Sequence, residues 1–137
     1  MQAPTVYLGG PMEGLQAGEM KGWREHARAL LPALFHVLDP TRRPAYGDQP
    51  YSPNLDRRTV AQDLLDIDHS HFMLVNLKDR GAGLCWVSLA EMMYGWQNGK
   101  VIFTVIEEGY NHPFVNTMST EVHHDLESAI ESLRYYV

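Results

Sequence analysis

Short apolar runs alternate along the chain with segments of helical periodicity. The runs cover residues 5–8, 35–38, 72–77 and 101–106, and a fifth, shorter run is expected at 120–123. They are rich in β-branched and aromatic residues and are nearly all apolar rather than alternating with polar positions. Continuous apolar runs are typical of parallel strands that are covered on both faces. The pattern predicts an α/β fold, a flavodoxin-like or Rossmann-like three-layer sandwich with a parallel sheet of four to five strands.

The segments between the runs carry apolar residues three and four positions apart, as amphipathic helices do. Three stripes are expected to face the sheet: Met20, Trp23, Ala27, Leu30, Leu31 and Leu34; Val60, Ala61, Leu64, Leu65 and Ile67; and Leu89, Met92, Met93 and Trp96. Asp125 is expected to cap a last helix. The segment 40–53 contains prolines and a glycine and is predicted to be a long loop, and loops of that length often bind ligands.

Composition narrows the possible classes of protein. The chain has 137 residues, of which 45% are hydrophobic, so residues 1–137 are expected to form a single domain with its own core. A net charge of −6 without a basic stripe disfavours a nucleic-acid polymer as partner, because affinity for a polyanion rests on neutralising phosphates. The single cysteine, Cys85, cannot form an internal disulfide, no signal segment opens the chain, and no apolar run approaches the roughly 20 residues that span a bilayer. We therefore expect a cytoplasmic protein without a membrane partner.

In open parallel sheets, ligands bind beyond the carboxyl ends of the strands, so the residues that follow each run are candidates for a binding site. They are Gly9, Gly10 and Pro11 after the first run, Asp39, Arg42 and Arg43 after the second, Cys85, Ser88 and Glu91 after the third, and the segment 107–116 after the fourth. The glycines and Asp39 invite a dinucleotide-binding interpretation. The spacing is not G-x-G-x-x-G, however, and Pro11 removes an amide that such a loop would direct at a pyrophosphate. No cofactor is predicted.

A series of short motifs follows these positions in order along nearly the whole chain. The motifs are Tyr-Leu-Gly-Gly-Pro-Met at 7–12, Trp23-Arg24, and the segments 38–43, 63–68, 88–91 with Gly99-Lys100, 112–115 and 125–127. Their succession resembles the nucleoside 2-deoxyribosyltransferase-like superfamily, which also contains 2′-deoxynucleoside 5′-monophosphate N-glycosidases. The resemblance implies that Glu91 is the nucleophile, that Tyr7 orients it and that Asp63 handles the leaving base.

The resemblance also implies a small-molecule partner, a nucleoside or nucleotide, and a homodimer or higher homo-oligomer with shared active sites. Asn116 or Ser119, in a segment predicted to be an exposed loop, lies where a contribution to the neighbouring subunit's site would originate. The predicted substrate-binding residues are Gly9, Gly10, Pro11, Asp39, Arg42, Arg43, Cys85, Ser88, Asn116 and Ser119.

The chemistry of N-glycosidic cleavage agrees with these roles. The reaction passes through an oxocarbenium-like state, so one carboxylate should attack or stabilise C1′ while a second group protonates the departing base. Glu91 lies early in its predicted helix, where the helix dipole favours the ionised form. Asp63 can carry a proton if it is partly desolvated near Glu91, because burial and a like charge both raise a carboxyl pKa. The structural alternatives are a solvated helix residue for Glu91, an acidic helix face for Asp63 and a core position for Tyr7.

Two positions depart from the family's pattern. Val87 and Ser88 stand where members usually have Gly-Thr or Gly-x-Gly, and Cys85 stands where transferases tend to have an aspartate and monophosphate hydrolases a serine. Arg42 and Arg43, in turn, could clamp a phosphate by bidentate hydrogen bonds, or they could lie in a solvated loop. The prediction is therefore deoxyribosyl transfer to another base or to water through a glycosyl-glutamate intermediate. The alternatives are a 5′-monophosphate N-hydrolase and a catalytically inactive nucleotide-binding module.

Histidines close to acidic residues raise the question of a metal site. His69 and His71 lie beside two aspartates, and His123 adjoins His124. No third ligand has a helpful spacing, so no metal is predicted.

Overall fold

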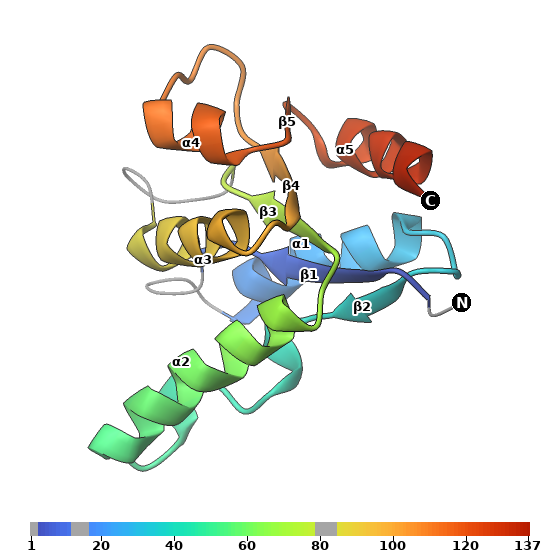
Figure 1. The fold of residues 1–137 in the computed structure, drawn as a ribbon. Coiled ribbons are helices and arrows are strands. Elements are labelled where there is room, and N and C mark those ends of the chain that lie inside the picture. Colours follow the sequence, from blue (N-terminus) through green and yellow to red (C-terminus); the bar gives the residue numbers. More distant parts are fainter. Residues whose placement is uncertain (1–2, 12–16, 79–84) are drawn as a thin grey trace.

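The computed structural model describes residues 3–11, 17–78 and 85–137. At its centre is a five-stranded sheet of order β2-β1-β3-β4-β5, in which every neighbouring pair of strands is parallel (Figure 1). The strands are β1 (Thr5–Gly9), β2 (His36–Leu38), β3 (Phe72–Asn76), β4 (Val101–Val105) and β5 (Glu121–His123). This strand order is that of flavodoxin-like folds, so the predicted fold class is confirmed.

Helices connect the strands on both sides of the sheet. The α-helices of the described residues are α1 (Ala17–Leu30), α2 (Pro53–Asp68), α3 (Trp86–Gln97), α4 (Pro113–Met118) and α5 (Leu126–Leu133). Short 3₁₀ helices are η1 (Pro40–Arg42), η2 (Tyr46–Asp48) and η3 (Arg134–Tyr136), the first two within the predicted long loop. None of the helices in the described part of the chain is long and apolar enough to cross a membrane.

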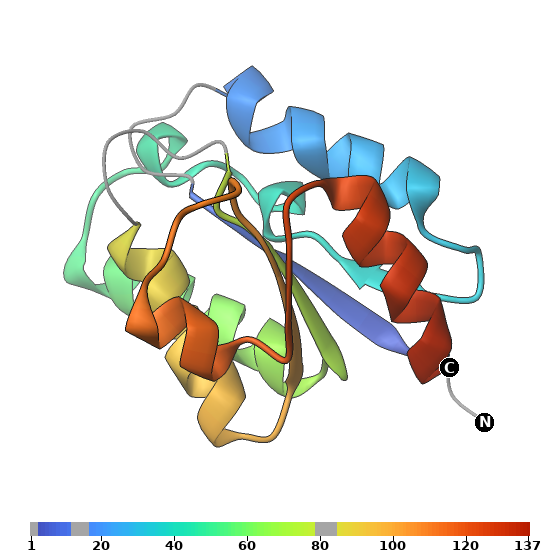
Figure 2. The same ribbon diagram turned by 90° about the horizontal axis from the view of Figure 1, so that it is seen from above.

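Two helical layers cover the sheet, with α1 and α5 on one face and α2, α3 and α4 on the other (Figure 2). Successive residues of a strand point to opposite faces. In β1, Val6 and Leu8 therefore pack toward α1 and α5, whereas Tyr7 points toward α2 and α3. The first core cluster includes Val6, Leu8, Ala27, Leu31, Phe72, Leu74, Phe103 and Ile130, and the second includes Tyr7, Ile67, Met73, Val75, Met92, Ile102, Val115 and Met118.

Local capping fixes where several helices begin and end. Ser52 Oγ accepts a hydrogen bond of 3.1 Å from the amide of Leu55 at the start of α2. Asp125 Oδ1 accepts one of 2.7 Å from the amide of Ser128, which confirms the predicted cap of α5. After α3, Gly99 has φ of 73°, a left-handed conformation that favours glycine and ends the helix.

The apolar stripe predicted for α2 is only partly correct. Ile67 is fully buried, but Val60 and Leu65 are 59% and 54% exposed. The helix is rotated so that its inner face carries charged residues, which ion pairs described below hold in place. Its buried positions are Leu55, Asp63, Asp66 and Ile67.

Other sequence predictions also need correction. The segment 111–119 is not an exposed loop, because it contains helix α4, whose Val115 and Met118 are buried. Trp96 of α3 is 45% exposed because it lines a surface groove with residues of α4 and does not face the sheet. Leu34 is exposed because α1 ends at Leu30, before the chain reaches it.

Candidate active site

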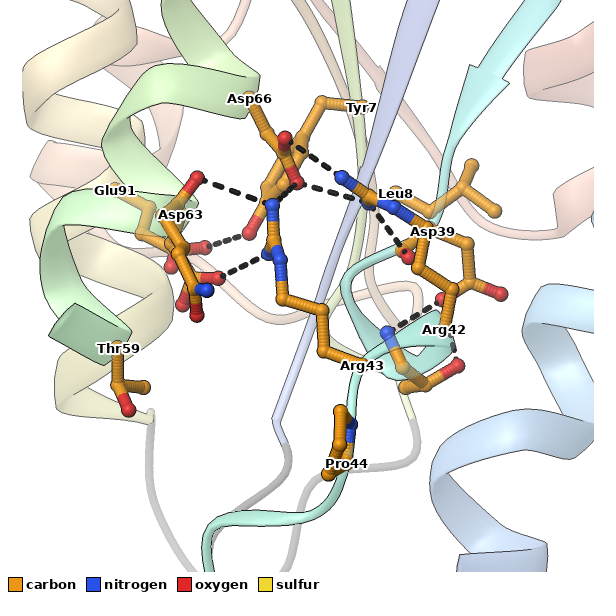
Figure 3. A network of polar contacts seen from close by, with 12 residues as sticks. Tyr7, Leu8, Asp39, Arg42, Arg43, Pro44, Thr59, Asp63, Asp66 and Glu91 are labelled. Carbon is orange, nitrogen blue, oxygen red and sulfur yellow. Dashed lines mark hydrogen bonds and ion pairs between the residues drawn. The ribbon is translucent and has the colours of Figure 1, made fainter. Parts of the chain in front are cut away.

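Three different elements bring Tyr7, Asp63 and Glu91 together (Figure 3). Tyr7 Oη, from the middle of β1, donates a hydrogen bond of 3.0 Å to Glu91 Oε1 on α3. Asp63, on α2, also forms a hydrogen bond with Glu91. The three residues are 0%, 8% and 8% exposed, in that order. The catalytic trio predicted from sequence is thus a contiguous, nearly dry cluster; the roles of its members remain predictions.

Burial determines the electrostatics of this trio. Burial, together with the nearby charge of Asp63, raises the pKa of Glu91 to about 8, although the hydrogen bond from Tyr7 acts in the opposite direction. Burial also raises the pKa of Asp63, against the effect of Arg43. The two contacting carboxyls therefore retain one shared proton near neutral pH and titrate as a pair. Burial and the charge of Glu91 raise the pKa of Tyr7, which keeps its phenol a hydrogen-bond donor.

Arg42 and Arg43 pair with carboxylates of α2. Arg42 donates two hydrogen bonds of 2.9 Å to the two oxygens of Asp66, and a third, also of 2.9 Å, to the carbonyl of Asp39. Arg43 Nη2 lies 2.8 Å from Asp66 Oδ2, and its Nη1 lies 3.3 Å from Asp63 Oδ1. Figure 3 shows the four side chains converging between the loop after β2 and α2. We call Arg42, Arg43, Asp63 and Asp66 the arginine–carboxylate network.

Sequence reasoning missed the part played by Asp66. It lies three positions after Asp63 and is therefore on the same helix face, which is the signal that was present in the sequence. That signal was masked because acidic residues on a helix are usually solvated.

Asp39 and Arg24 lie on the far side of β1 and serve the backbone. Asp39 Oδ1 accepts hydrogen bonds from Thr41 N (2.8 Å) and Thr41 Oγ1 (2.6 Å), so it caps η1. Arg24 is fully buried and donates to the carbonyls of Leu8 and Gly10, while its Nε lies 3.8 Å from Asp39 Oδ1. Burial lowers the pKa of Arg24, and Asp39 opposes that effect. A buried arginine on α1 was not expected from the apolar stripe of that helix.

The turn after β1 needs small residues for packing. A Cβ on Gly10 would lie 3.0 Å from the Asn76 carbonyl oxygen and 3.0 Å from the Trp23 ring, so only glycine fits between β3 and α1. Gly9 and Pro11 are buried on either side of it. The substrate-binding role of these three residues remains a prediction.

Ser88 is the clearest unexplained polar group near the trio. It lies one helical turn before Glu91 on the inner face of α3 and is 1% exposed. Within the described ranges, its Oγ is the buried side-chain polar atom without any hydrogen-bond partner. An unsatisfied buried hydroxyl costs about 1–3 kcal/mol, and the predicted role of Ser88 in binding a polar group of the substrate remains a prediction. Cys85, half-buried, precedes α3 and makes no side-chain cap.

The structure does not bring Asn116 and Ser119 into contact with the trio. Ser119 Oγ is 2.7 Å from Thr104 Oγ1 at the end of α4. Asn116 is exposed and donates to Asn111 Oδ1. Beside them, α3 and α4 form an open apolar groove of about 160 Å³. Its lining residues are Met93, Trp96, Pro113, Phe114, Thr117 and Met118.

Three of the four histidines considered as metal ligands have structural partners. His71 Nδ1 accepts from the amide of Thr5 at 3.1 Å, His123 contacts Glu121 and Ser128, and His124 contacts the carbonyl of Ile106. Across residues 3–11, 17–78 and 85–137, no group of three or more histidine, cysteine or acidic side chains could hold a metal ion.

Comparison with known proteins supports the fold. No protein-family model matches the sequence, and no curated protein matches it significantly. A 2-deoxyribosyltransferase from Bacillus psychrosaccharolyticus superposes with a TM-score of 0.69 at 14% identity, covering 92% of this chain and 90% of its own. The chain has the fold of this deoxyribosyltransferase.

Two further solved structures share that deoxyribosyltransferase fold. A conserved protein from Enterococcus faecalis V583 has a TM-score of 0.75 at 11% identity, with coverage of 98% of this chain and 99% of its own. A CMP N-glycosidase from Clostridium botulinum has a TM-score of 0.58 at 15% identity, with coverage of 97% and 99%. The predicted resemblance is confirmed at the level of fold, and what the site does is a separate question.

Proposed function

We propose that this chain, as a single domain of residues 1–137, cleaves the N-glycosidic bond of a 2′-deoxynucleoside. Glu91 is the nucleophile at C1′, Asp63 is the acid that protonates the leaving base, and Tyr7 orients Glu91. The observation that carries the proposal is the buried cluster in which Glu91 contacts both a phenol donor at 3.0 Å and a second carboxyl group. Deoxyribosyl transfer and N-glycoside hydrolysis by the structural neighbours support this class of reaction.

The proposed reaction has two steps. In the first, a Glu91 oxygen forms a bond to C1′ as the C1′–N bond breaks, and the base leaves with the proton of Asp63. In the second, a new base or water attacks C1′, Asp63 takes up the acceptor's proton, and Glu91 is released as a carboxylate. The first step requires an ionised Glu91 and a protonated Asp63, a distribution that the shared proton of the pair can supply.

The contact between the carboxyls favours a covalent intermediate. Enzymes that invert at the sugar carbon place a water between two carboxyls roughly 6.5–9.5 Å apart. Asp63 and Glu91 are in hydrogen-bond contact, which is closer than the separation at which such a water is placed. Direct attack by Glu91 is therefore the route that this geometry supports.

The 5′ group of the substrate is the point on which two candidate functions differ. Arg42 and Arg43 are engaged by Asp66 and Asp63, so clamping a phosphate would break ion pairs that the protein already makes. This supports a nucleoside without a phosphate as the first candidate. The free Ser88 hydroxyl near the start of α3, together with the CMP N-glycosidase neighbour, supports a 5′-monophosphate hydrolase as the second.

We also propose that the protein assembles into a homodimer or higher oligomer. The apolar groove between α3 and α4 and the exposed Phe114 beside it provide a surface for a second copy. Asn116, which is exposed on α4, is the residue we expect to reach the neighbour's site.

Incubation with each common deoxynucleoside and its 5′-monophosphate, with and without a second base, tests the proposed function. Chromatography should detect free base or a new nucleoside, and Glu91→Gln should abolish it. Glu108→Gln, at an exposed position, is the matched charge control and should be active. If the folded wild-type protein binds these compounds but cleaves none of them, the chain is instead the inactive nucleotide-binding module.

A further inference from the structure

Arg43 touches two carboxylates of α2 at once. Its Nη2 lies 2.8 Å from Asp66 Oδ2 and its Nη1 lies 3.3 Å from Asp63 Oδ1, with the side chain 21% exposed. The neighbouring residue Arg42 holds this part of the loop against α2, because it binds both oxygens of Asp66. A positive charge is thereby held against Asp63, the residue that also hydrogen-bonds with Glu91.

This placement decides which carboxyl of the pair is ionised. A guanidinium beside Asp63 stabilises the charged form of that residue. Glu91 is equally buried but receives only a neutral donor, the Tyr7 hydroxyl at 3.0 Å, and no arginine contact among the described residues. The shared proton therefore belongs on Glu91 in the free protein. The proposed reaction needs the reverse distribution, with the proton on Asp63 and the charge on Glu91.

We propose that Arg43 is a positioning residue that controls where the shared proton resides. While Arg43 contacts Asp63, the proton stays on Glu91 and the nucleophile is inactive. When a bound substrate displaces Arg43 from Asp63, the proton passes from the Glu91 carboxyl to the Asp63 carboxyl, and Glu91 becomes ionised. This inference rests on the proposed function for its consequence, although the proton distribution itself can be measured without turnover.

The distances make this displacement feasible. The contact of Arg43 with Asp66, at 2.8 Å, is the shorter of its two ion pairs, so we expect it to persist when the 3.3 Å contact with Asp63 is released. Asp66 is also held by Arg42, so the loop stays anchored to α2 throughout. Release of Asp63 therefore removes one weak contact without leaving a buried guanidinium unpaired.

Several charged or titratable groups act on the Asp63–Glu91 pair. They come from each element packed against it: Tyr7 of β1, Arg24 of α1, Asp66 of α2 and Arg43 of the loop after β2. Among the described residues, Arg43 is the only cation within ion-pair distance of Asp63.

Carboxyl titration by ¹³C NMR of aspartate- and glutamate-labelled free protein tests the proposal directly. Arg43→Gln should raise the titration midpoint of Asp63 and lower that of Glu91, each by about one pH unit. Arg43→Lys should stay close to wild type, since it keeps the charge. Arg57→Gln, which removes an exposed arginine bound only to Asn54 among the described contacts, is the matched control and should change neither midpoint.

A second variant, expected to shift both titration midpoints in the opposite direction, keeps the test decisive if Arg43→Gln fails to fold. Asp66→Asn removes the second partner of Arg43 and a like charge near Asp63, so it should lower the Asp63 midpoint and raise that of Glu91. Unchanged midpoints in the folded Arg43 or Asp66 variant would overturn the proposal.

Kinetics provide a second readout. The active free enzyme carries one proton on the pair, so loss of the Arg43 charge should strengthen retention of that proton. Arg43→Gln should therefore move the upper pH limit of kcat/KM upward by about one unit, whereas Arg57→Gln should not. A lower kcat with an unshifted pH profile and unshifted carboxyl midpoints would show a merely structural role. Absence of any glycosidic cleavage, with the NMR shifts as expected, would refute the proposed function and leave this inference standing.

Discussion

Replacing Glu91 with glutamine should change how stability depends on pH, whether or not the substrate is known. Glu91 is 8% exposed, and burial with the charge of Asp63 raises its pKa from 4.5 to about 8. Glutamine has nearly the same shape and can still accept the hydrogen bond from Tyr7 Oη. The substitution therefore removes the titration while preserving most of the packing.

The sign follows from the protons bound in each state. Between pH 4.5 and 8, the folded protein keeps the Glu91 proton that the unfolded chain has already lost. The free energy of unfolding must therefore fall as pH rises through this window, and it levels off above it. At about 1.4 kcal/mol for each pH unit, the loss has an upper limit of about 5 kcal/mol. Because Asp63 shares the proton, and its own pKa relaxes when Glu91 is neutral, we expect the measured difference to be about 2–5 kcal/mol.

Urea unfolding followed by circular dichroism at pH 5, 7 and 9 measures this effect. The stability of Glu91→Gln minus that of wild type should increase with pH, with most of the change complete by pH 9. Glu108→Gln, on the surface, should run parallel to wild type and corrects for other titrating groups. A Glu91→Gln difference that is the same at all three pH values would refute the raised pKa and, with it, the shared proton on which the mechanism depends.

Four further predictions concern activity and assembly. Tyr7→Phe should lower kcat by roughly 10–100-fold with little change in KM, since it removes one hydrogen bond to the nucleophile; an unchanged kcat would contradict the orienting role. Asp63→Asn should lower kcat by about 10²–10⁴-fold for a neutral deoxynucleoside. The loss should be far smaller for a deoxynucleoside whose base is already cationic, because that base leaves without a proton. Equal losses on both substrates would argue against an acid role. Ser88→Ala should leave urea stability unchanged or higher while lowering kcat/KM, because its hydroxyl has no partner in the described part of the protein; a loss of stability with full activity would make it structural. Sedimentation at micromolar concentration should show a dimer or larger species that Phe114→Arg weakens, and a monomeric wild type would exclude shared sites.

Much of the fold could be predicted because parallel strands buried on both faces have continuous apolar sequences. All five predicted strands were found within one or two residues of their expected limits. Helix α4 was missed because six residues starting at a proline carry too little periodicity to indicate a helix. It forms through tertiary contacts, with Val115 and Met118 buried and the His112 side chain accepting from the amide of Phe114.

The candidate site was less predictable because its important contacts join residues far apart in sequence. The order of motifs pointed to Tyr7, Asp63 and Glu91, and the structure places them together. Sequence could not show that Arg42 and Arg43 bind α2, since that depends on the path of the connection formed by residues 39–52. From sequence alone, a phosphate clamp and a solvated loop are therefore both open for these arginines.

The apolar pattern of the sequence predicts the buried helix faces least well around the candidate site, and this has a physical reason. Buried charges are costly unless they are paired, and a hydrophobic side chain would usually fill such positions with equal or better stability. Arg24, Asp63, Asp66 and Glu91 are nevertheless all buried, on the three helices α1, α2 and α3. Arg24 pairs with Asp39, and Asp63 and Asp66 pair with Arg42 and Arg43, so loss of one member of a pair leaves the other charge uncompensated. Retention of so expensive a group, next to a serine hydroxyl without a partner in the described structure, is better explained by chemistry on a ligand than by stability.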